Sequence, residues 1–259
     1  MFKIIRIAVL LCVLGSVAST LLIQRNVVRD WSGTLDIQII PVIADKKSNT
    51  QAYVESLKER DFDSINRYLI TQAKRFNVDL NYSLSINVTA PTFNVPPAVP
   101  SHDASRISIM LWSLKLKWWA WRNQAKDHKL SQIRLYVLYQ SPEDSTPLPH
   151  STGLRNGLIG LINARANHSQ RTLHPIIITH ELLHILGASD QYNLSTGEPL
   201  YPNGYAEPNK EPLLPQRFTS IMARAKQINS SKFEVATHLR QTVINEVTAS
   251  EIGWLRPSQ

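Results

Sequence analysis

Residues 175 to 187 constrain the fold of this chain most strongly, because their pattern predicts one complete helix that carries a few polar residues in a mainly apolar run. Pro175 suits the first turn of a helix, where the missing N–H of proline costs no hydrogen bond. The apolar run IIITHELLHIL then continues for about three turns to Gly187, a residue type that commonly ends helices. We therefore expect a helix that begins at Pro175 and ends at Gly187.

Two histidines in this helix have the spacing of metal ligands. His180 and His184 are four residues apart and lie on one face, so both imidazoles can approach one zinc ion at about 2.0–2.1 Å. Glu181 points too far round the helix to be a third ligand, but it can take a proton from a zinc-activated water. The alternative interpretation is that both histidines are ordinary residues of a buried helix face.

Asp190 is the best candidate for a third ligand. Gly187 can adopt the left-handed conformation that turns the chain back at the end of a helix. Asp190 follows three residues later and carries a carboxylate, which zinc accepts as a ligand. The weaker candidates lie upstream, in the irregular stretch after the helix, or near the C-terminus: His174, Glu198, Glu207, Glu211, Glu246 and Glu251.

The segment HELLHILGASD, residues 180–190, resembles the extended zinc-binding motif of the metzincin metallopeptidases, His-Glu-x-x-His-x-x-Gly-x-x-His. Asp190 stands where most of these families have a third histidine, which is similar to the snapalysin type. The sequence Ser220-Ile221-Met222-Ala223 resembles the methionine-containing turn that lies beneath the metal in this family. The resemblance extends over residues 178–223.

This resemblance implies a zinc-dependent endopeptidase that acts on peptide or protein substrates. It implies that His180, His184 and Asp190 bind Zn²⁺, that Glu181 is the general base, and that Met222 forms the floor of the site. It also implies that an extended substrate pairs with the edge strand before the helix, by position residues 156–164. Two alternatives stay open: a catalytically inactive, membrane-tethered zinc-binding module, and a gluzincin-type enzyme that uses Glu246 or Glu251.

The order of the remaining elements indicates an α/β (α+β) fold. We expect strands within residues 34–43, 82–90, 131–140 and 155–164, and helices within 50–76, as one helix or a broken pair, and 104–122. Strands that alternate with helices favour a sheet packed on helices, and the resemblance makes it a mixed, twisted zincin-like sheet. We expect one domain over residues 31–259, with an upper lobe to about residue 187 and a smaller, irregular lower lobe from about 188.

The helix expected at residues 104–122 contains Trp112, Trp118, Trp119 and Trp121 among basic residues. The preferred interpretation is that these tryptophans pack the helix onto the sheet. The alternative is a helix that lies on a membrane surface.

The first thirty residues have the composition of a targeting segment. Lys3 and Arg6 precede an apolar run at residues 7–23, which predicts either a retained membrane anchor or a signal peptide cleaved near Ala18. The domain is then membrane-anchored, or secreted or periplasmic. Cys12, the single cysteine, lies in this run, so the domain has no disulfide. The charge of +8 is scattered and indicates no nucleic-acid partner, and the oligomeric state is open.

Overall fold

The structure, a computed structural model, describes residues 34–80, 84–101, 103–123 and 132–255, together with Arg6 and Trp31. The elements up to the histidine-bearing helix are β1 (Leu35–Ile43), α2 (Ser48–Glu55), η1 (Glu59–Asp61), α3 (Asp63–Lys74), β2 (Leu84–Val88), α4 (Arg106–Arg122), β3 (Ile133–Gln140), β4 (Thr152–Leu154), β5 (Ile159–Arg165), η2 (His168–Gln170) and α5 (His174–Leu186). The remaining elements are β6 (Thr219–Ser220), β7 (Lys226–Gln227), β8 (Phe233–Glu234), η3 (Leu239–Gln241), β9 (Thr242–Val243) and α6 (Glu246–Glu251).

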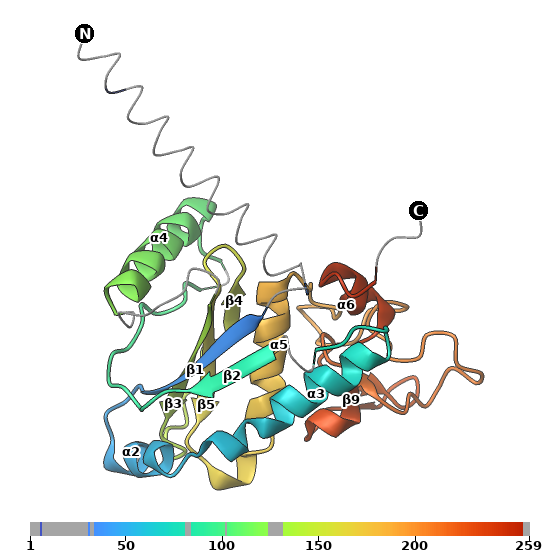
Figure 1. Cartoon of the computed structure of the whole chain (residues 1–259). Coiled ribbons are helices and arrows are strands. Elements are labelled where there is room, and N and C mark those ends of the chain that lie inside the picture. The colour runs from blue at the N-terminus through green and yellow to red at the C-terminus, as the bar shows by residue number, and fades with distance from the viewer. Residues whose placement is uncertain are drawn as a thin grey trace.

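A five-stranded mixed sheet forms the centre of the molecule, in the order β2-β1-β3-β5-β4 (Figure 1). The first four strands are parallel, and β4 pairs antiparallel with β5. Strands β3 and β5 are buried at almost every position, as expected for parallel strands with both faces covered. The predicted α/β (α+β) class, with a mixed sheet packed on helices, is confirmed.

Helices cover both faces of this sheet. On one face, α3 and α5 pack with the C-terminal region over a core that includes Ile37, Leu135 and Leu182. Helix α3 is amphipathic, and its buried positions, Ile65, Tyr68, Leu69, Gln72 and Ala73, recur at helical spacing. On the other face, α4 buries Leu116 and Ala120 against a second cluster that includes Val42, Tyr136 and Ile159 (Figure 1). The predicted helix at residues 50–76 is the broken pair, α2 and α3.

The tryptophans of α4 are divided between the sheet and solvent. Trp112 and Trp119 pack against the second core cluster, and the ring of Trp119 meets that of Tyr136 edge-on at 5.1 Å. Trp118 and Trp121 are 56% and 64% exposed. The prediction that the tryptophans pack this helix on the sheet is therefore confirmed for Trp112 and Trp119 and wrong for Trp118 and Trp121, which lie on the exposed part of the helix surface.

The edge of the sheet differs from the prediction. Gly157 and Leu158 adopt positive φ and reverse the chain, so residues 152–154 form β4 outside β5. The edge strand is therefore β4, and the expectation that residues 156–164 form the edge is wrong. A strand of three residues is too short to produce a visible alternation of apolar and polar residues.

The prediction of a membrane-spanning anchor, with the membrane as a partner and a membrane-anchored location, is wrong for the part of the chain that the structure describes. No helix there is long and apolar enough to cross a bilayer. The longest, α4, has 17 residues and includes four lysines or arginines, whereas a span requires about 20 mainly apolar residues. Residues 1–30, on which the prediction rested, lie outside the described residues apart from Arg6.

Residues 188–255 contain only short elements. Strands β6 and β9 pair over two residues, as do β7 and β8, and α6 has six residues. Side-chain hydrogen bonds therefore organise much of this region. Its assignment as a separate lower lobe that begins at about residue 188 stays a prediction.

Candidate metal centre

Helix α5 ends as its sequence predicts, and this ending brings Asp190 towards the histidines. Gly187 has φ of +119°, a left-handed conformation that glycine adopts without steric cost. The N–H groups of Gly187 and Ala188 both donate to the carbonyl of Leu183, at 3.0 and 2.9 Å. These bonds turn the chain sharply across the end of the helix, so that residue 190 lies beside the helix face that carries both histidines.

His180, His184 and Asp190 converge at one point. Their ligand atoms lie within 4.8 Å of one another, and this is the one such group of three found in the described residues. The two Nε2 atoms are 3.0 Å apart, and Asp190 Oδ1 lies 3.2 Å from His180 Nε2 and 3.3 Å from His184 Nε2. Ligand atoms around a tetrahedral zinc ion with bonds of about 2.0–2.1 Å lie about 3.3 Å apart. The three atoms therefore have nearly the separation that a tetrahedral metal requires.

Backbone carbonyls orient both imidazoles. His180 Nδ1 lies 3.0 Å from the carbonyl oxygen of Ile221, and His184 Nδ1 lies 2.9 Å from that of Ala188. A carbonyl can only accept, so each Nδ1 carries the proton and donates it. Each Nε2 is then left with its lone pair directed at the shared point, which is the arrangement typical of metal-binding histidines.

The methionine-containing turn is in direct contact with this site. Ile221, whose carbonyl holds His180, precedes Met222, which is completely buried. The N–H of Ala223 donates to the carbonyl of Ser220 at 2.9 Å and closes the turn. The resemblance to metzincins predicted this turn beneath the metal ligands, and in the structure the turn contacts His180 through the Ile221 carbonyl.

Gln191, which the sequence analysis did not select, ties Asp190 to this turn. Its N–H donates to the carbonyl of Met222, and its side-chain Oε1 accepts from Ser220 Oγ and Asn245 Nδ2, each at 2.9 Å. Its Nε2 donates to Thr248 Oγ1 at 2.8 Å. Gln191 is 2% exposed, so this network is buried and fixes the backbone beside Asp190. A glutamine next to a candidate ligand carries no sequence signature of such a role.

Glu181 is a buried carboxyl group with an unused oxygen. The residue is 5% exposed, and its Oε2 has no hydrogen-bond partner among the described residues. Burial raises the pKa of Glu181, the two histidines oppose this rise, and the Asp190 carboxylate adds to it. An orphaned oxygen here is costly unless another group, such as a water or a substrate, meets it.

The pKa values of Asp190 and His184 are both shifted by their neighbours. Burial alone would raise the pKa of Asp190, but His180 and His184, whose Nε2 atoms donate to the carboxylate when the imidazoles are protonated, outweigh burial and hold the pKa far below its usual range. Burial alone would lower the pKa of His184, but Asp190 and the Ala188 carbonyl raise it. Asp190 is therefore anionic at neutral pH, which suits a ligand for a cation.

Strand β4 passes directly over the histidine-bearing helix. A Cβ added at Gly153 would lie 2.5 Å from the backbone oxygen of Glu181 and 3.0 Å from the Cβ of His184. Only glycine permits this approach. The outer edge of the sheet therefore runs beside the three-residue cluster.

The other candidate ligands lie elsewhere. His174 packs against the rings of Tyr53 and Tyr139, and Glu251 accepts hydrogen bonds from the backbone and side chain of Ser189. Neither residue belongs to the cluster. Glu198, Glu207, Glu211 and Glu246 also lie outside it.

Tyr192 lies near the site, where it interacts with Asp190. Burial raises its pKa, and the carboxylates of Asp190 and Glu181 raise it further. Tyr205 instead donates its hydroxyl proton to Gln227, and Tyr201 is 61% exposed.

The geometry defines a mixed α/β fold with a His-His-Asp group that can hold a metal ion. No model of a known protein family matches the chain, and no curated protein matches it. The resemblance to metzincins therefore rests on the motif residues and on their arrangement in this chain.

Proposed function

We propose that this chain is a zinc-dependent endopeptidase. His180, His184 and Asp190 would hold the zinc ion, and Glu181 would act as the general base. The observation that carries the proposal is the convergence of two imidazole nitrogens and one carboxylate oxygen at 3.0–3.3 Å from one another. Catalytic zinc sites typically have three protein ligands, and histidine nitrogens and carboxylate oxygens are among the usual ligand atoms.

Zinc, when bound, would supply Lewis-acid activation of water and of the scissile carbonyl. The residues of the chain would do the rest. Glu181 would take a proton at its orphaned Oε2 and later return it to the leaving amine. Burial raises the pKa of this carboxyl towards neutral pH, which suits both the uptake and the release of the proton. The carbonyls of Ile221 and Ala188 would keep the imidazoles in the tautomer that binds metal.

The free edge of β4 supports a peptide as the substrate. Within the described residues β4 pairs with β5 alone, so its other edge offers backbone groups for an added strand. Gly153 in this strand lies against Glu181 and His184. A peptide that pairs with β4 in extended form would therefore pass alongside the metal ligands.

The proposal is tested by expressing the whole chain, measuring bound zinc, and following cleavage of a mixed peptide library by mass spectrometry. We expect about one zinc per chain and cleavage that a chelator abolishes. Glu181→Gln should retain zinc and lose at least about 10²-fold in activity, the scale expected for a general base. Glu198→Gln, which makes the same chemical change at an exposed position outside the cluster, should leave both unchanged.

Failure takes two distinct forms. A chain that neither contains zinc nor can be loaded with it contradicts the metal site itself. A chain that binds zinc tightly but cleaves no peptide contradicts the peptidase and favours a catalytically inactive zinc-binding module.

A further inference from the structure

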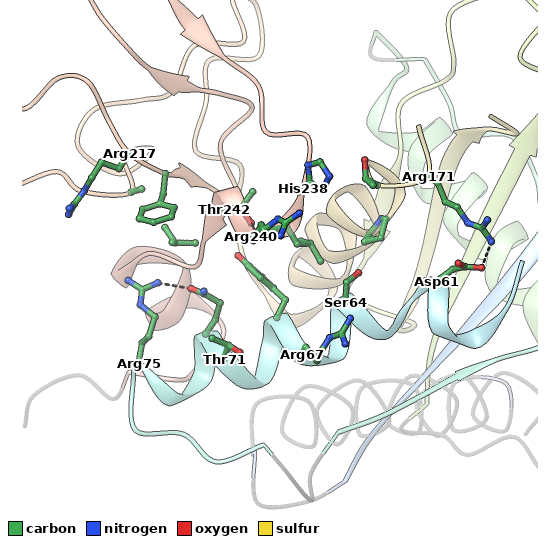
Figure 2. A pocket seen from close by; sticks show the side chains of 18 of the residues that line it. Asp61, Ser64, Arg67, Thr71, Arg75, Arg171, Arg217, His238, Arg240 and Thr242 are labelled. Atoms are coloured by element: carbon green, nitrogen blue, oxygen red, sulfur yellow. Dashed lines mark hydrogen bonds and ion pairs between the residues drawn. The ribbon is translucent and has the colours of Figure 1, made fainter. Parts of the chain in front are cut away.

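A large cavity separate from the candidate metal centre lies between α3 and the C-terminal region. Its volume is about 1010 Å³. Figure 2 shows that α3 forms one wall, the segment before α5 a second, and the region around β6 and β9 a third. His180, Glu181, His184 and Asp190 are not among its lining residues.

Arginine dominates the charge of this cavity. Six arginines from four separate segments line it: Arg60, Arg67, Arg75, Arg171, Arg217 and Arg240. Two carboxylates, Asp61 and Glu207, also line it, so arginine exceeds carboxylate by four. No lysine of the described residues lines the cavity. This preference matters because the planar guanidinium forms paired hydrogen bonds with oxyanions, whereas an ammonium group acts as a point charge.

Half of these arginines are committed to protein partners. Arg171 pairs with Asp61, and Arg217 pairs with Glu207. Arg75 Nη1 donates to Gln72 Oε1 at 2.6 Å and to the carbonyl of Ile244 at 3.2 Å, so its position is fixed (Figure 2).

The other three arginines, Arg60, Arg67 and Arg240, form no ion pair within the described residues. Arg67 lies on α3 and Arg240 lies just before β9, so these two guanidiniums reach the cavity from different walls (Figure 2). Unpaired positive charges gathered at one concave site attract anions.

Hydroxyl groups complete the polar lining. Ser64, Thr71 and Thr242 contribute side chains to the cavity. Tyr68 also lines it, and its buried hydroxyl lies beside that of Thr242.

We propose that this cavity binds a ligand that carries two or more phosphate or sulfate groups. Arg67 and Arg240 would each form a forked contact with one group, because both guanidiniums lack a protein carboxylate and come from different walls. Arg75, held in place by Gln72 and the Ile244 carbonyl, would add a fixed positive charge. A ligand with two or more such groups can form a forked contact with each arginine, so the site favours multivalent anions.

Calorimetric titration of the whole chain tests this proposal. Sucrose octasulfate is the sulfate probe, tripolyphosphate is the phosphate probe, and inorganic phosphate is the single-group control. At least one of the two multivalent probes should bind at least tenfold more tightly than inorganic phosphate. The probe with the higher affinity shows whether the cavity prefers phosphate or sulfate groups. Tripolyphosphate also chelates metals. Only the part of the binding heat that is lost when Arg67 and Arg240 are replaced is therefore assigned to the cavity.

Matched variants separate this cavity from general positive charge. The pair Arg67→Gln and Arg240→Gln should weaken binding of the stronger probe by about tenfold or more, the scale of losing a charged hydrogen bond. The pair Arg106→Gln and Arg122→Gln removes the same charge from α4 and should change binding by less than about twofold.

A lysine pair tests the forked contacts themselves. Arg67→Lys with Arg240→Lys keeps the charge and should still lose several-fold in affinity. Three results would overturn the proposal: no binding of either multivalent probe below millimolar concentration, equal losses in the cavity and α4 pairs, or wild-type affinity in the lysine pair.

Discussion

Replacing Gly153 with alanine tests whether β4 and the histidine-bearing helix pack as tightly as the structure indicates. The new Cβ would lie 2.5 Å from the backbone oxygen of Glu181 and 3.0 Å from His184 Cβ. The first contact involves backbone, which cannot rotate away, so strand and helix must separate. Overpacking of this kind costs about 1–3 kcal/mol. A displaced His184 should also weaken zinc binding.

Gly160→Ala is the matched control, because Gly160 is the partner of Gly153 across the β4–β5 pair. A Cβ there would meet the ends of flexible side chains, at 2.8 Å from Leu135 Cδ2 and 3.3 Å from Ile162 Cδ1. These ends can shift, so the cost should lie near the lower end of the overpacking range, at about 1 kcal/mol, and zinc affinity should not change.

The assay is urea unfolding in the presence of a chelator, so that bound metal does not contribute to stability. Zinc affinity is measured separately by competition with a chromophoric chelator. Gly153→Ala as stable as the wild type, with the same zinc affinity, would refute the close approach of β4 to His184.

Three further predictions concern the core, acid stability and the support of the site. Leu116→Ala should lower the free energy of unfolding by about 2–5 kcal/mol, because Leu116 is buried. Leu114→Ala, at a position that is 55% exposed, should change it by less than about 0.5 kcal/mol. Equal losses of stability in the two variants would contradict the orientation of α4. Burial lowers the pKa of His174 from 6.5 to about 4, so the unfolded state binds this proton at higher pH than the folded state does, and the free energy of unfolding should fall as the pH drops from 6.5 to 4. Urea midpoints measured over this range should fall less for His174→Gln than for the wild type. Identical pH profiles would argue against a buried neutral imidazole. Gln191→Ala should lower the free energy of unfolding by about 2 kcal/mol or more, because it leaves buried hydrogen-bonding partners unsatisfied. It should also weaken zinc binding several-fold, because Asp190 is no longer held in place. Unchanged zinc affinity would show that the network does not position Asp190.

The sequence was most informative where one residue type has a specific physical consequence. Pro175 and Gly187 delimited the helix correctly to within a residue, because proline and glycine restrict or extend the backbone conformations at its ends. The spacing of His180, His184 and Asp190 predicted a common metal site, and these three residues do form the cluster. Local rules were sufficient here because all three residues lie within one helix and the turn that follows it.

Features that depend on contacts between distant segments could not be predicted in this way. The role of Gln191 depends on Asn245, which is 54 residues away, and on the buried turn at Ser220. The composition of α4 indicated an amphipathic helix but did not reveal that Trp118 and Trp121 face away from the sheet. The arginine-lined cavity brings together residues from 60 to 240, and no local motif marks them as neighbours.

Zinc titration of the wild-type chain and of Asp190→Ala tests the central claim most directly. We predict one site per chain in the wild type, with affinity at least tenfold weaker in Asp190→Ala because the anionic ligand is lost. Glu198→Ala removes the same charge outside the cluster and should bind zinc as the wild type does. Absence of a zinc site in the wild type, or equal affinity in the wild type and Asp190→Ala, would contradict the His180–His184–Asp190 centre.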